Sequence, residues 1–378
     1  MQNQSKPVLI FAQSGRFLAQ SASQAGYRVW VADCFGDMDT LVASERWQGL
    51  PKLASLTCKQ FLTVLQSLTK GEECSLIYGS GIEQCAHLLH QLPNHIELIA
   101  NSADTINTIK TPTLFFDILN TLNLPYPTTV FDKDLANTDY IAKSISGLGG
   151  SHIRPISQSD SLQNNYFQKI TDGTPGSALF LANGKKAQIL SINRQYIEPT
   201  PRSPYRLGMI ESPLDITSTH QKLITKACNR ITQKTGLKGL NSLDFIISQK
   251  NELFILEVNP RPSASIELIE SKFIPIIQLH INACHGRLIT KSLETPSCIN
   301  SFRYIFAEKN FSIPSDMVWP VECSDIAKSA SLIKKDEPIC SCLVQASDHA
   351  AAMVKHKIIL AQIIKQLLPQ TNCSLYSY

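Results

Sequence analysis

Residues 256–265, LEVNPRPSAS, place three polar side chains directly after an apolar run. Alternate side chains of a β-strand lie on the same face, so Glu257 and Asn259 share a face, and Arg261 joins them if the strand continues. Val258 points the other way, into a core. A face that presents Glu, Asn and Arg in succession is not a packing face, and we interpret it as one that holds a charged ligand.

A second carboxylate belongs to the same predicted hairpin, which spans residues 242–260 with its turn at 249–251. Asp244 lies on the first strand and faces Glu257 across the ladder, where two like charges repel unless a cation lies between them. Carboxylate and amide oxygens suit Mg²⁺, which usually shares its ligands with phosphates. We therefore predict that Asp244, Glu257 and Asn259 bind Mg²⁺. The alternative is a surface hairpin with ordinary ion pairs.

Lys143 lies in a predicted strand just before the glycine-rich stretch GLGGSHI, residues 147–153. Glycines let backbone N–H groups approach a phosphate without obstruction, and a neighbouring lysine adds a positive charge for the same anion. Lys110, which precedes a predicted helix, is a second candidate cation. Each signal is weak alone, but beside a Mg²⁺-type hairpin they predict a nucleoside triphosphate site.

Composition restricts the other classes of function. The chain has 378 residues, a net charge of +4 and 43% hydrophobic residues, which indicates two or three globular domains without a nucleic-acid partner. Eleven cysteines are scattered without a CxxC pair, so we predict reduced thiols and a cytoplasmic location. We find no signal segment and no apolar run of membrane-spanning length, so we expect no membrane partner.

The first hundred residues alternate between predicted strands and helices, which favours a parallel sheet with helical crossovers. We predict strands at 7–13, 27–33, 75–81 and 95–101, with helices at 14–26 and 82–92. Glycine-containing turns at 13–16 and 79–81 follow two of these strands. Each turn is either a tight strand-to-helix connection or an anion-binding ledge for a substrate.

The remaining chain mixes antiparallel strands with helices. We predict a helix within 107–130, a strand–loop–strand at 140–157, strands at 166–173, 177–184 and 187–197, and helices at 220–236, 266–284 and 348–369. Further strands are predicted at 302–308 and 338–347. Residues 198–215 contain four prolines, and we predict an ordered loop over the site.

These motifs together resemble the ATP-grasp superfamily, in particular predicted ATP-dependent carboxylate ligases related to biotin carboxylase. The resemblance is carried by YFQKITDGTPGSALFLANGKK, LKGLNSLDFII and LFILEVNPRPSAS. It implies an α/β and α+β fold class in three parts. These are a Rossmann-like pre-ATP-grasp domain at 1–103, a two-lobed ATP-grasp domain at 104–290, and a small β-rich C-terminal domain with a terminal helix at 291–378.

The resemblance also implies ATP and Mg²⁺ as cofactors, with Mn²⁺ as a substitute, and a role for each matched residue. Lys110 and Lys143 would contact the ATP phosphates, and Arg261 would orient the reacting carboxylate, so Lys143 and Arg261 are the candidate catalytic residues. Lys169 stands where many relatives carry an acidic residue. The glycine loop would bind phosphate and the linker strand would bind adenine through its backbone; the residues implied are Gly147, Gly149, Gly150 and Ser151 for the loop, and Gln168, Lys169 and Ile170 for the linker.

The implied function is that of an ATP-dependent carboxylate–amine ligase that forms an amide through an acyl phosphate. Its partners would be small-molecule carboxylate and amine substrates, with a homodimer left open. By analogy, the product belongs to the biosynthesis of a C1-carrier cofactor of the methanofuran or tetrahydromethanopterin type. Two alternatives remain, a bicarbonate-activating ATP-dependent carboxylase and a non-catalytic nucleotide-binding protein.

Overall fold

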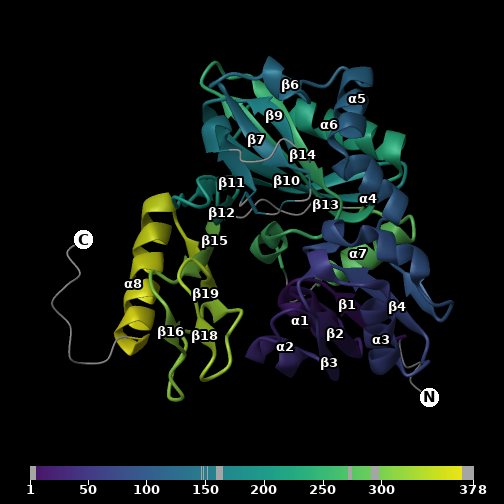
Figure 1. Ribbon diagram of the computed structural model, residues 1–378, viewed down its shortest axis with the longest axis vertical. Coiled ribbons are helices and arrows are strands. Elements are labelled where there is room, and N and C mark those ends of the chain that lie inside the picture. Colours follow the sequence, from purple (N-terminus) through teal and green to yellow (C-terminus); the bar gives the residue numbers. More distant parts are fainter. Residues whose placement is uncertain are drawn as a thin grey trace.

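The computed structural model describes residues 6–145, 147, 149–150, 152–158, 165–270, 275–290 and 298–367. Its N-terminal part is a five-stranded parallel sheet in the order β3-β2-β1-β4-β5 (Figure 1). The strands are β1 (Val8–Phe11), β2 (Val29–Asp33), β3 (Arg46–Gly49), β4 (Cys74–Tyr78) and β5 (Ile96–Leu98). The helices are α1 (Arg16–Gln24), α2 (Met38–Ala43) and α3 (Cys58–Thr69), with 3-10 helices η1 (Leu53–Ser55), η2 (Ile82–Gln84) and η3 (Ala86–Gln91).

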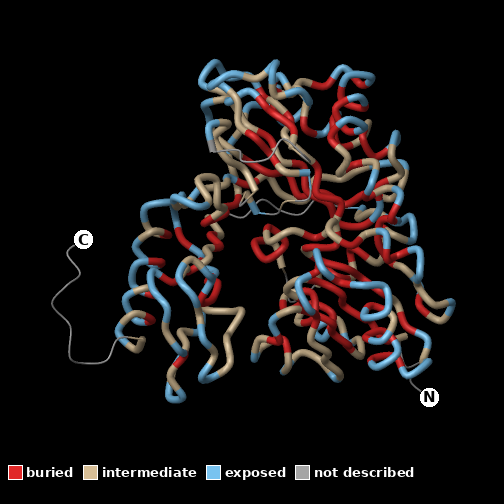
Figure 2. Tube along the Cα trace, viewed as in Figure 1, coloured by how far each residue is buried: buried red, intermediate tan, exposed pale blue. Residues whose placement is uncertain are grey.

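Both faces of this sheet are buried, as a parallel sheet requires. Leu9 and Phe11 of β1 pack in one cluster with Phe61 of α3. Val8 and Ile10 point to the opposite face, where their cluster includes residues of α1 and of α7 (Ile276–Cys284). The central strands β1 and β2 are therefore continuous buried segments (Figure 2).

A four-stranded antiparallel sheet, in the order β6-β9-β7-β8, forms a small lobe. Its strands are β6 (Thr129–Val130), β7 (Tyr140–Ser144), β8 (Ile153–Pro155) and β9 (Asn165–Lys169). The helices α4 (Ala103–Lys110) and α5 (Pro112–Thr121) connect it to the N-terminal part, and the short 3-10 helices η4 (Lys133–Leu135) and η5 (Ile156–Gln158) lie between its strands.

An eight-stranded sheet, in the order β14-β13-β10-β11-β12-β15-β19-β17, runs through the rest of the molecule. Its strands are β10 (Gly173–Asn183), β11 (Ala187–Ile197), β12 (Leu207–Ser212), β13 (Lys238–Ser248), β14 (Leu253–Asn259), β15 (Ile299–Phe306), β17 (Cys323–Ser324) and β19 (Pro338–Ala346). The remaining elements are α6 (Ser218–Thr235), η6 (Ala264–Leu268), α8 (His349–Leu367) and the pair β16 (Phe311–Ser312) and β18 (Leu332–Ile333). The predicted fold class, a parallel α/β part followed by antiparallel α+β parts, is confirmed.

Several predicted elements were wrong in detail. The helix predicted within 107–130 is two helices, because the residue before a proline avoids the α region, and Thr111 before Pro112 has ψ 109°. The helix predicted at 82–92 is the pair η2 and η3, separated at Cys85, where φ is −138°. The predicted loop 198–215 contains β12, a strand that lies between β11 and β15 in the large sheet. In the described part of the chain, no helix is long and apolar enough to cross a membrane.

His280 of α7 makes stability depend on pH. Its Nδ1 accepts a hydrogen bond from the Leu240 N–H at 3.0 Å, and its Nε2 donates to the Ile99 carbonyl oxygen at 2.7 Å. Protonation would place an N–H against the Leu240 N–H. Burial lowers the pKa of His280 from 6.5 to about 4. In the unfolded chain the imidazole takes up a proton near pH 6.5, so this contribution to stability is present above that pH and is lost as pH falls toward 4.

We expect the free energy of unfolding to fall by roughly 2–3 kcal/mol from pH 7 to pH 4.5 through this group alone. Urea denaturation of the wild type and of His280→Gln at both pH values measures the difference. The exposed His285→Gln variant is the matched control and should keep the wild-type slope. If the free energy of unfolding of His280→Gln changed with pH as much as that of the wild type, His280 would not be the source of the pH dependence.

Candidate active site

The hairpin of β13 and β14 brings the predicted metal ligands together. Asp244 and Glu257 are directly paired across the two strands, as predicted, and a β-bulge follows Asp244. The Asn259 amide nitrogen donates to Asp244 Oδ2 at 3.1 Å and to Glu257 Oε1 at 3.4 Å. Two carboxylates and an amide therefore share one face of the hairpin. Their role as metal ligands stays a prediction.

Lys110, the last residue of α4, lies at this oxygen-rich face. Its ammonium donates to Glu257 Oε2 at 3.0 Å and to Asn259 Oδ1 at 3.4 Å. Burial opposes the ionisation of Glu257, but Lys110 and then Lys143 outweigh it, so the pKa of Glu257 lies well below its usual range. Burial and the charge of Glu257 raise the pKa of Asp244 to about 7. The face thus attracts a cation, and a lysine lies against it.

Lys143, on β7 of the small lobe, is almost fully buried at 4% exposure. Its ammonium donates to Gln168 Oε1 at 3.2 Å and lies 5.7 Å from the centre of the Tyr166 ring. Burial lowers the pKa of Lys143, while Glu257 and then Asp244 favour its charged form. The two predicted phosphate-binding lysines therefore approach the same pair of carboxylates from different elements.

The glycine loop is described only in part, and Ser151 lies outside the described residues. Gly149 and Gly150 have positive φ values of 58° and 75°, a conformation that favours glycine. A side chain at Gly150 would collide with the carbonyl oxygen of Tyr205, whereas a Cβ at Gly149 would have no atom of the other described residues within 4 Å. The Leu207 N–H also donates to the Gly149 carbonyl oxygen at 3.3 Å. The loop therefore packs on the segment that precedes β12.

This packing gives a prediction for a matched pair of variants. Gly149→Ala meets only the backbone strain of positive φ, roughly 1 kcal/mol. Gly150→Ala meets that strain and the collision with Tyr205, so the loop must move. We expect Gly150→Ala to weaken MgATP binding by at least about tenfold and Gly149→Ala by only a few-fold. Calorimetric titration with MgATP measures both, and equal losses would contradict this view of the loop.

The linker between the lobes carries the residues predicted to contact adenine. The Gln168 side chain is buried and accepts from Lys143, whereas Lys169 is exposed. The N–H groups of Lys169 and Ile170 already donate, to the carbonyl oxygens of Thr128 (2.8 Å) and Asp139 (2.7 Å). Backbone contacts to a base at these two residues are therefore restricted to their carbonyl groups.

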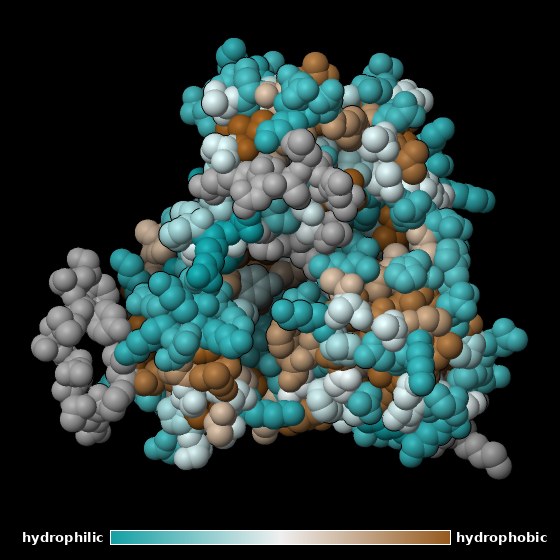
Figure 3. All heavy atoms as spheres, in the orientation of Figure 1, coloured by the Kyte–Doolittle hydropathy of each residue, from teal (hydrophilic) through white to brown (hydrophobic). Residues whose placement is uncertain are grey.

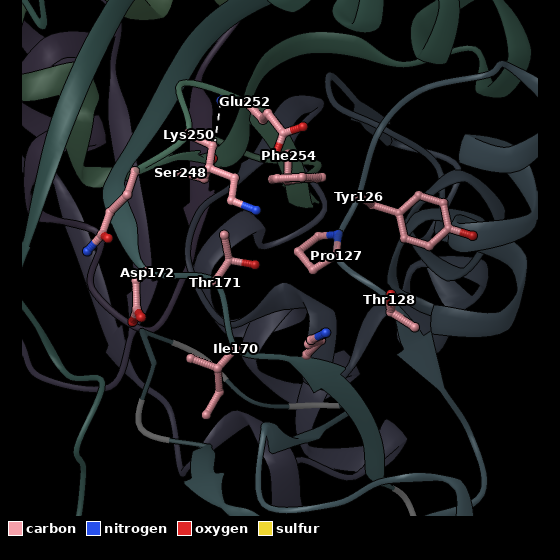
Figure 4. Close-up of a pocket in the computed structure, with 12 residues that line it drawn as sticks. Tyr126, Pro127, Thr128, Ile170, Thr171, Asp172, Ser248, Lys250, Glu252 and Phe254 are labelled. Carbon is pink, nitrogen blue, oxygen red and sulfur yellow. Dashed lines mark hydrogen bonds between the residues drawn. The ribbon is translucent and has the colours of Figure 1, made fainter.

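A cavity of about 390 Å³ lies against this linker (Figure 4). Its walls come from the linker, from the segment after α5 and from the tip of the β13–β14 hairpin. The lining residues are Tyr126, Pro127, Thr128, Lys169, Ile170, Thr171, Asp172, Ser248, Gln249, Lys250, Glu252 and Phe254. The cavity lies at the tip of the hairpin, and Asp244 lies farther along β13.

Arg261 follows the end of β14 and does not continue the strand. Its Nε donates to Glu83 Oε1 at 2.7 Å, and its Nη1 donates to the Pro262 carbonyl oxygen at 3.1 Å. Burial opposes its charge, but Glu83 outweighs this, and the pKa of Arg261 is raised. Glu83 was not among the predicted site residues; the one local signal for it is its position just after the glycine turn at 79–81.

The two glycine turns of the N-terminal part are tight connections whose polar groups have protein partners. The Gly15 N–H donates to Asp33 Oδ2 at 3.0 Å. Gly81 has a φ of 89° and leads into the three-residue helix η2. A side chain at Gly79 would approach Ala12 to 2.9 Å. Of the two alternatives, the structure favours the tight turn at both positions.

Figure 3 shows the surface hollowed between the N-terminal and C-terminal parts.

A small antiparallel lobe and a carboxylate hairpin that faces two lysines are the parts expected of an ATP-grasp domain. Residues 113–265 match the family model described as an ATP-grasp domain. This part of the chain is therefore an ATP-grasp domain, as its motifs predicted.

Two curated relatives share parts of this chain. The carbamoyl phosphate synthase large chain of Haemophilus ducreyi is 23% identical over 230 residues, which are 54% of this chain and 21% of that protein. The tyramine–L-glutamate ligase of Methanocaldococcus jannaschii is 28% identical over 128 residues, 34% of this chain and 37% of that protein. The chain thus matches about a fifth of one relative and about a third of the other.

Solved structures show the same fold over nearly the whole chain. Biotin carboxylase from Campylobacter jejuni has a TM-score of 0.71 at 14% identity, covering 95% of this chain and 91% of that one. L-amino acid ligase from Bacillus licheniformis has a TM-score of 0.68 at 14% identity, covering 96% and 98%. At such identities the similarity concerns the fold.

Proposed function

We propose that this protein is an ATP-dependent ligase that joins a carboxylate to an amine through an acyl phosphate. The observation that carries the proposal is the paired Asp244 and Glu257, approached by Lys110 and Lys143, with Arg261 at the end of the same strand. We keep the proposed division into a pre-ATP-grasp domain (1–103), an ATP-grasp domain (104–290) and a C-terminal domain (291–378).

The donor set fits a divalent cation. Asp244, Glu257 and Asn259 offer oxygens on one face, and the Lys110 ammonium already lies against two of them. These three residues would hold Mg²⁺, which would neutralise charge on the ATP phosphates when bound. On ATP binding, Lys110 would exchange its carboxylate contact for a phosphate. The cavity against the linker would lie beside the adenine.

The proposed reaction has two steps. In the first, an oxygen of the substrate carboxylate attacks the γ-phosphorus of ATP and ADP leaves; Arg261 orients the carboxylate, while Lys110, Lys143 and the glycine loop stabilise the transferred phosphoryl group. In the second, the amine nitrogen attacks the acyl carbon, phosphate leaves, and the nitrogen loses a proton. The protein contributes positioning and charge.

The substrates are small molecules. The likeness to a tyramine–L-glutamate ligase and to an L-amino acid ligase supports an amino acid as one of them. We propose a place in the biosynthesis of a C1-carrier cofactor of the methanofuran or tetrahydromethanopterin type. That placement rests on the tyramine–L-glutamate ligase likeness.

Phosphate release from MgATP tests the proposal against amino acids, other small carboxylates, bicarbonate and amines, including L-glutamate with tyramine. Glu257→Gln serves as the inactive protein. Glu97→Gln, in the N-terminal part with a side chain that is 48% exposed, is the control and should remain active. Turnover that needs both an acid and an amine supports the ligase. Turnover with bicarbonate alone would replace it with a carboxylase, and MgATP binding without turnover on any combination would contradict catalysis.

A further inference from the structure

Residues of the N-terminal part make hydrogen bonds to the turn that carries Arg261. The Pro260 carbonyl oxygen accepts hydrogen bonds from Asn101 Nδ2 at 2.9 Å and from the Tyr78 hydroxyl at 3.2 Å. Tyr78 and Asn101 are 0% and 2% exposed. Tyr78 ends β4 and Asn101 follows β5, so both come from one edge of the parallel sheet, which lies directly below the hairpin in Figure 1.

Asn101 also ties this turn to the strand opposite. Its Nδ2 donates to Asn241 Oδ1 at 2.9 Å, and its Oδ1 accepts from the Lys238 N–H at 2.7 Å. Asn241 and Lys238 lie on β13, which pairs with β14. One buried amide thus holds the base of the hairpin on both strands. It fixes the hairpin relative to the N-terminal sheet.

Glu83 holds the Arg261 side chain itself. Its side chain is 2% exposed and that of Arg261 is 11% exposed, with 2.7 Å between Glu83 Oε1 and Arg261 Nε. Among the described residues, none makes a hydrogen bond to Glu83 Oε2, which is buried.

A buried ion pair of this kind contributes little net stability, because desolvation offsets the attraction. An oxygen left unpaired at the same carboxylate adds a further cost. The contact between Glu83 and Arg261 is better explained as one that orients the Arg261 side chain. Glu83 Oε1 accepts a hydrogen bond from Nε and the Pro262 carbonyl oxygen accepts one from Nη1, and these two contacts fix the plane of the Arg261 guanidinium. Misplacement of a reacting group by 1 Å costs about a hundredfold in rate.

We propose that Tyr78, Glu83 and Asn101 form a clamp that positions Arg261 for the carboxylate substrate. They are positioning residues, because each acts through the 259–261 turn. The inference deepens the proposed function and rests on it, since it assumes that Arg261 binds the carboxylate. It also gives the glycine turn at 79–81 a role, because this turn brings Glu83 to the hairpin.

The test separates carboxylate binding from ATP binding. Acyl phosphate is trapped as a hydroxamate with hydroxylamine and MgATP, using L-glutamate and each acid of the substrate panel. We expect Glu83→Ala to raise the KM for the carboxylate by about ten- to a hundredfold, with the Kd for MgATP unchanged within about threefold. Glu83→Gln keeps an oxygen that accepts a hydrogen bond from Arg261 Nε, so it should raise the KM for the carboxylate less than Glu83→Ala does. Glu97→Gln, an exposed ion-pair partner of Lys6 in the same part, should behave as the wild type.

A double variant decides whether Glu83 acts through Arg261. Glu83→Ala combined with Arg261→Ala should be no worse than Arg261→Ala alone. Additive losses, an equal rise in the Kd for MgATP, or a wild-type KM in Glu83→Ala would overturn the clamp while leaving the ligase intact. Tyr78→Phe removes one hydrogen bond to Pro260 and provides a milder variant if Glu83→Ala does not fold. If the wild type forms no hydroxamate with any acid, the proposed function fails and the clamp falls with it.

Discussion

Lys143→Met is expected to lose MgATP-dependent turnover by about two to three orders of magnitude while folding at least as well as the wild type. Burial lowers the pKa of this lysine, so the folded protein holds a cation in an unfavourable place. Methionine fills a similar volume without the charge. The loss of activity follows because a positive group aimed at the developing charge of the transferred phosphoryl contributes on this scale.

Steady-state phosphate release and urea denaturation measure the two effects on the same protein. Lys185→Met, in the turn between β10 and β11 where the lysine is exposed, is the matched control and should change neither. A Lys143→Met variant with turnover within about fivefold of the wild type would show that this lysine is a packing residue. A Lys143→Met variant that loses both stability and turnover would also show that Lys143 is a packing residue.

Arg16→Met is expected to have the largest effect on stability. The Arg16 side chain is 3% exposed and lies 2.6 Å from Glu267, 3.0 Å from Asp325 and 3.8 Å from Asp39. Its removal leaves three carboxylates close together without a cation. Burial already raises the pKa of Glu267 to about 7 despite Arg16. Breaking a buried ion cluster by removing one member costs about 3–5 kcal/mol.

Arg28→Met provides the control, because Arg28 also pairs with a carboxylate, Glu45, at 2.8 Å but is 35% exposed. A surface pair of this kind contributes at most about 1 kcal/mol. Chemical denaturation at pH 7.5 compares the two variants. Because Asp325 belongs to the C-terminal part, Arg16→Met should also loosen that part from the N-terminal sheet. If both variants lost the same free energy of unfolding, burial of Arg16 would not explain its larger expected contribution.

The hairpin was predictable because its information is local. Alternation placed Asp244, Glu257 and Asn259 on one face, and the pairing of Asp244 with Glu257 was confirmed. The register of the turn pairs Phe245 with Ile255, and the β-bulge after Asp244 shifts the pairing by one residue to Glu257. The parallel sheet followed from alternating strands and helices in the same way. The chemical types of these residues predict a cation with oxygen ligands, and this stays a prediction.

Contacts between distant segments were not predictable. Glu83 meets Arg261 across 178 positions, and Asn101 meets Pro260 across 159. Nothing in the residues around Glu83 specifies that partner, since the contact depends on how the N-terminal sheet docks on the hairpin. The strand β12 was missed for a related reason. Prolines at 199–204 and 213 suggested a loop, but strands on both sides supply partners for the backbone between them.

The central claim is that ATP phosphorylates a carboxylate held by this protein, and the most direct measurement follows an oxygen atom. The acid identified in the substrate panel is labelled with ¹⁸O in its carboxylate and incubated with the protein, MgATP and the amine. Formation of an acyl phosphate predicts one ¹⁸O atom transferred to the released phosphate, with ADP as the other product. Unlabelled phosphate, or release of AMP and pyrophosphate, would contradict the mechanism.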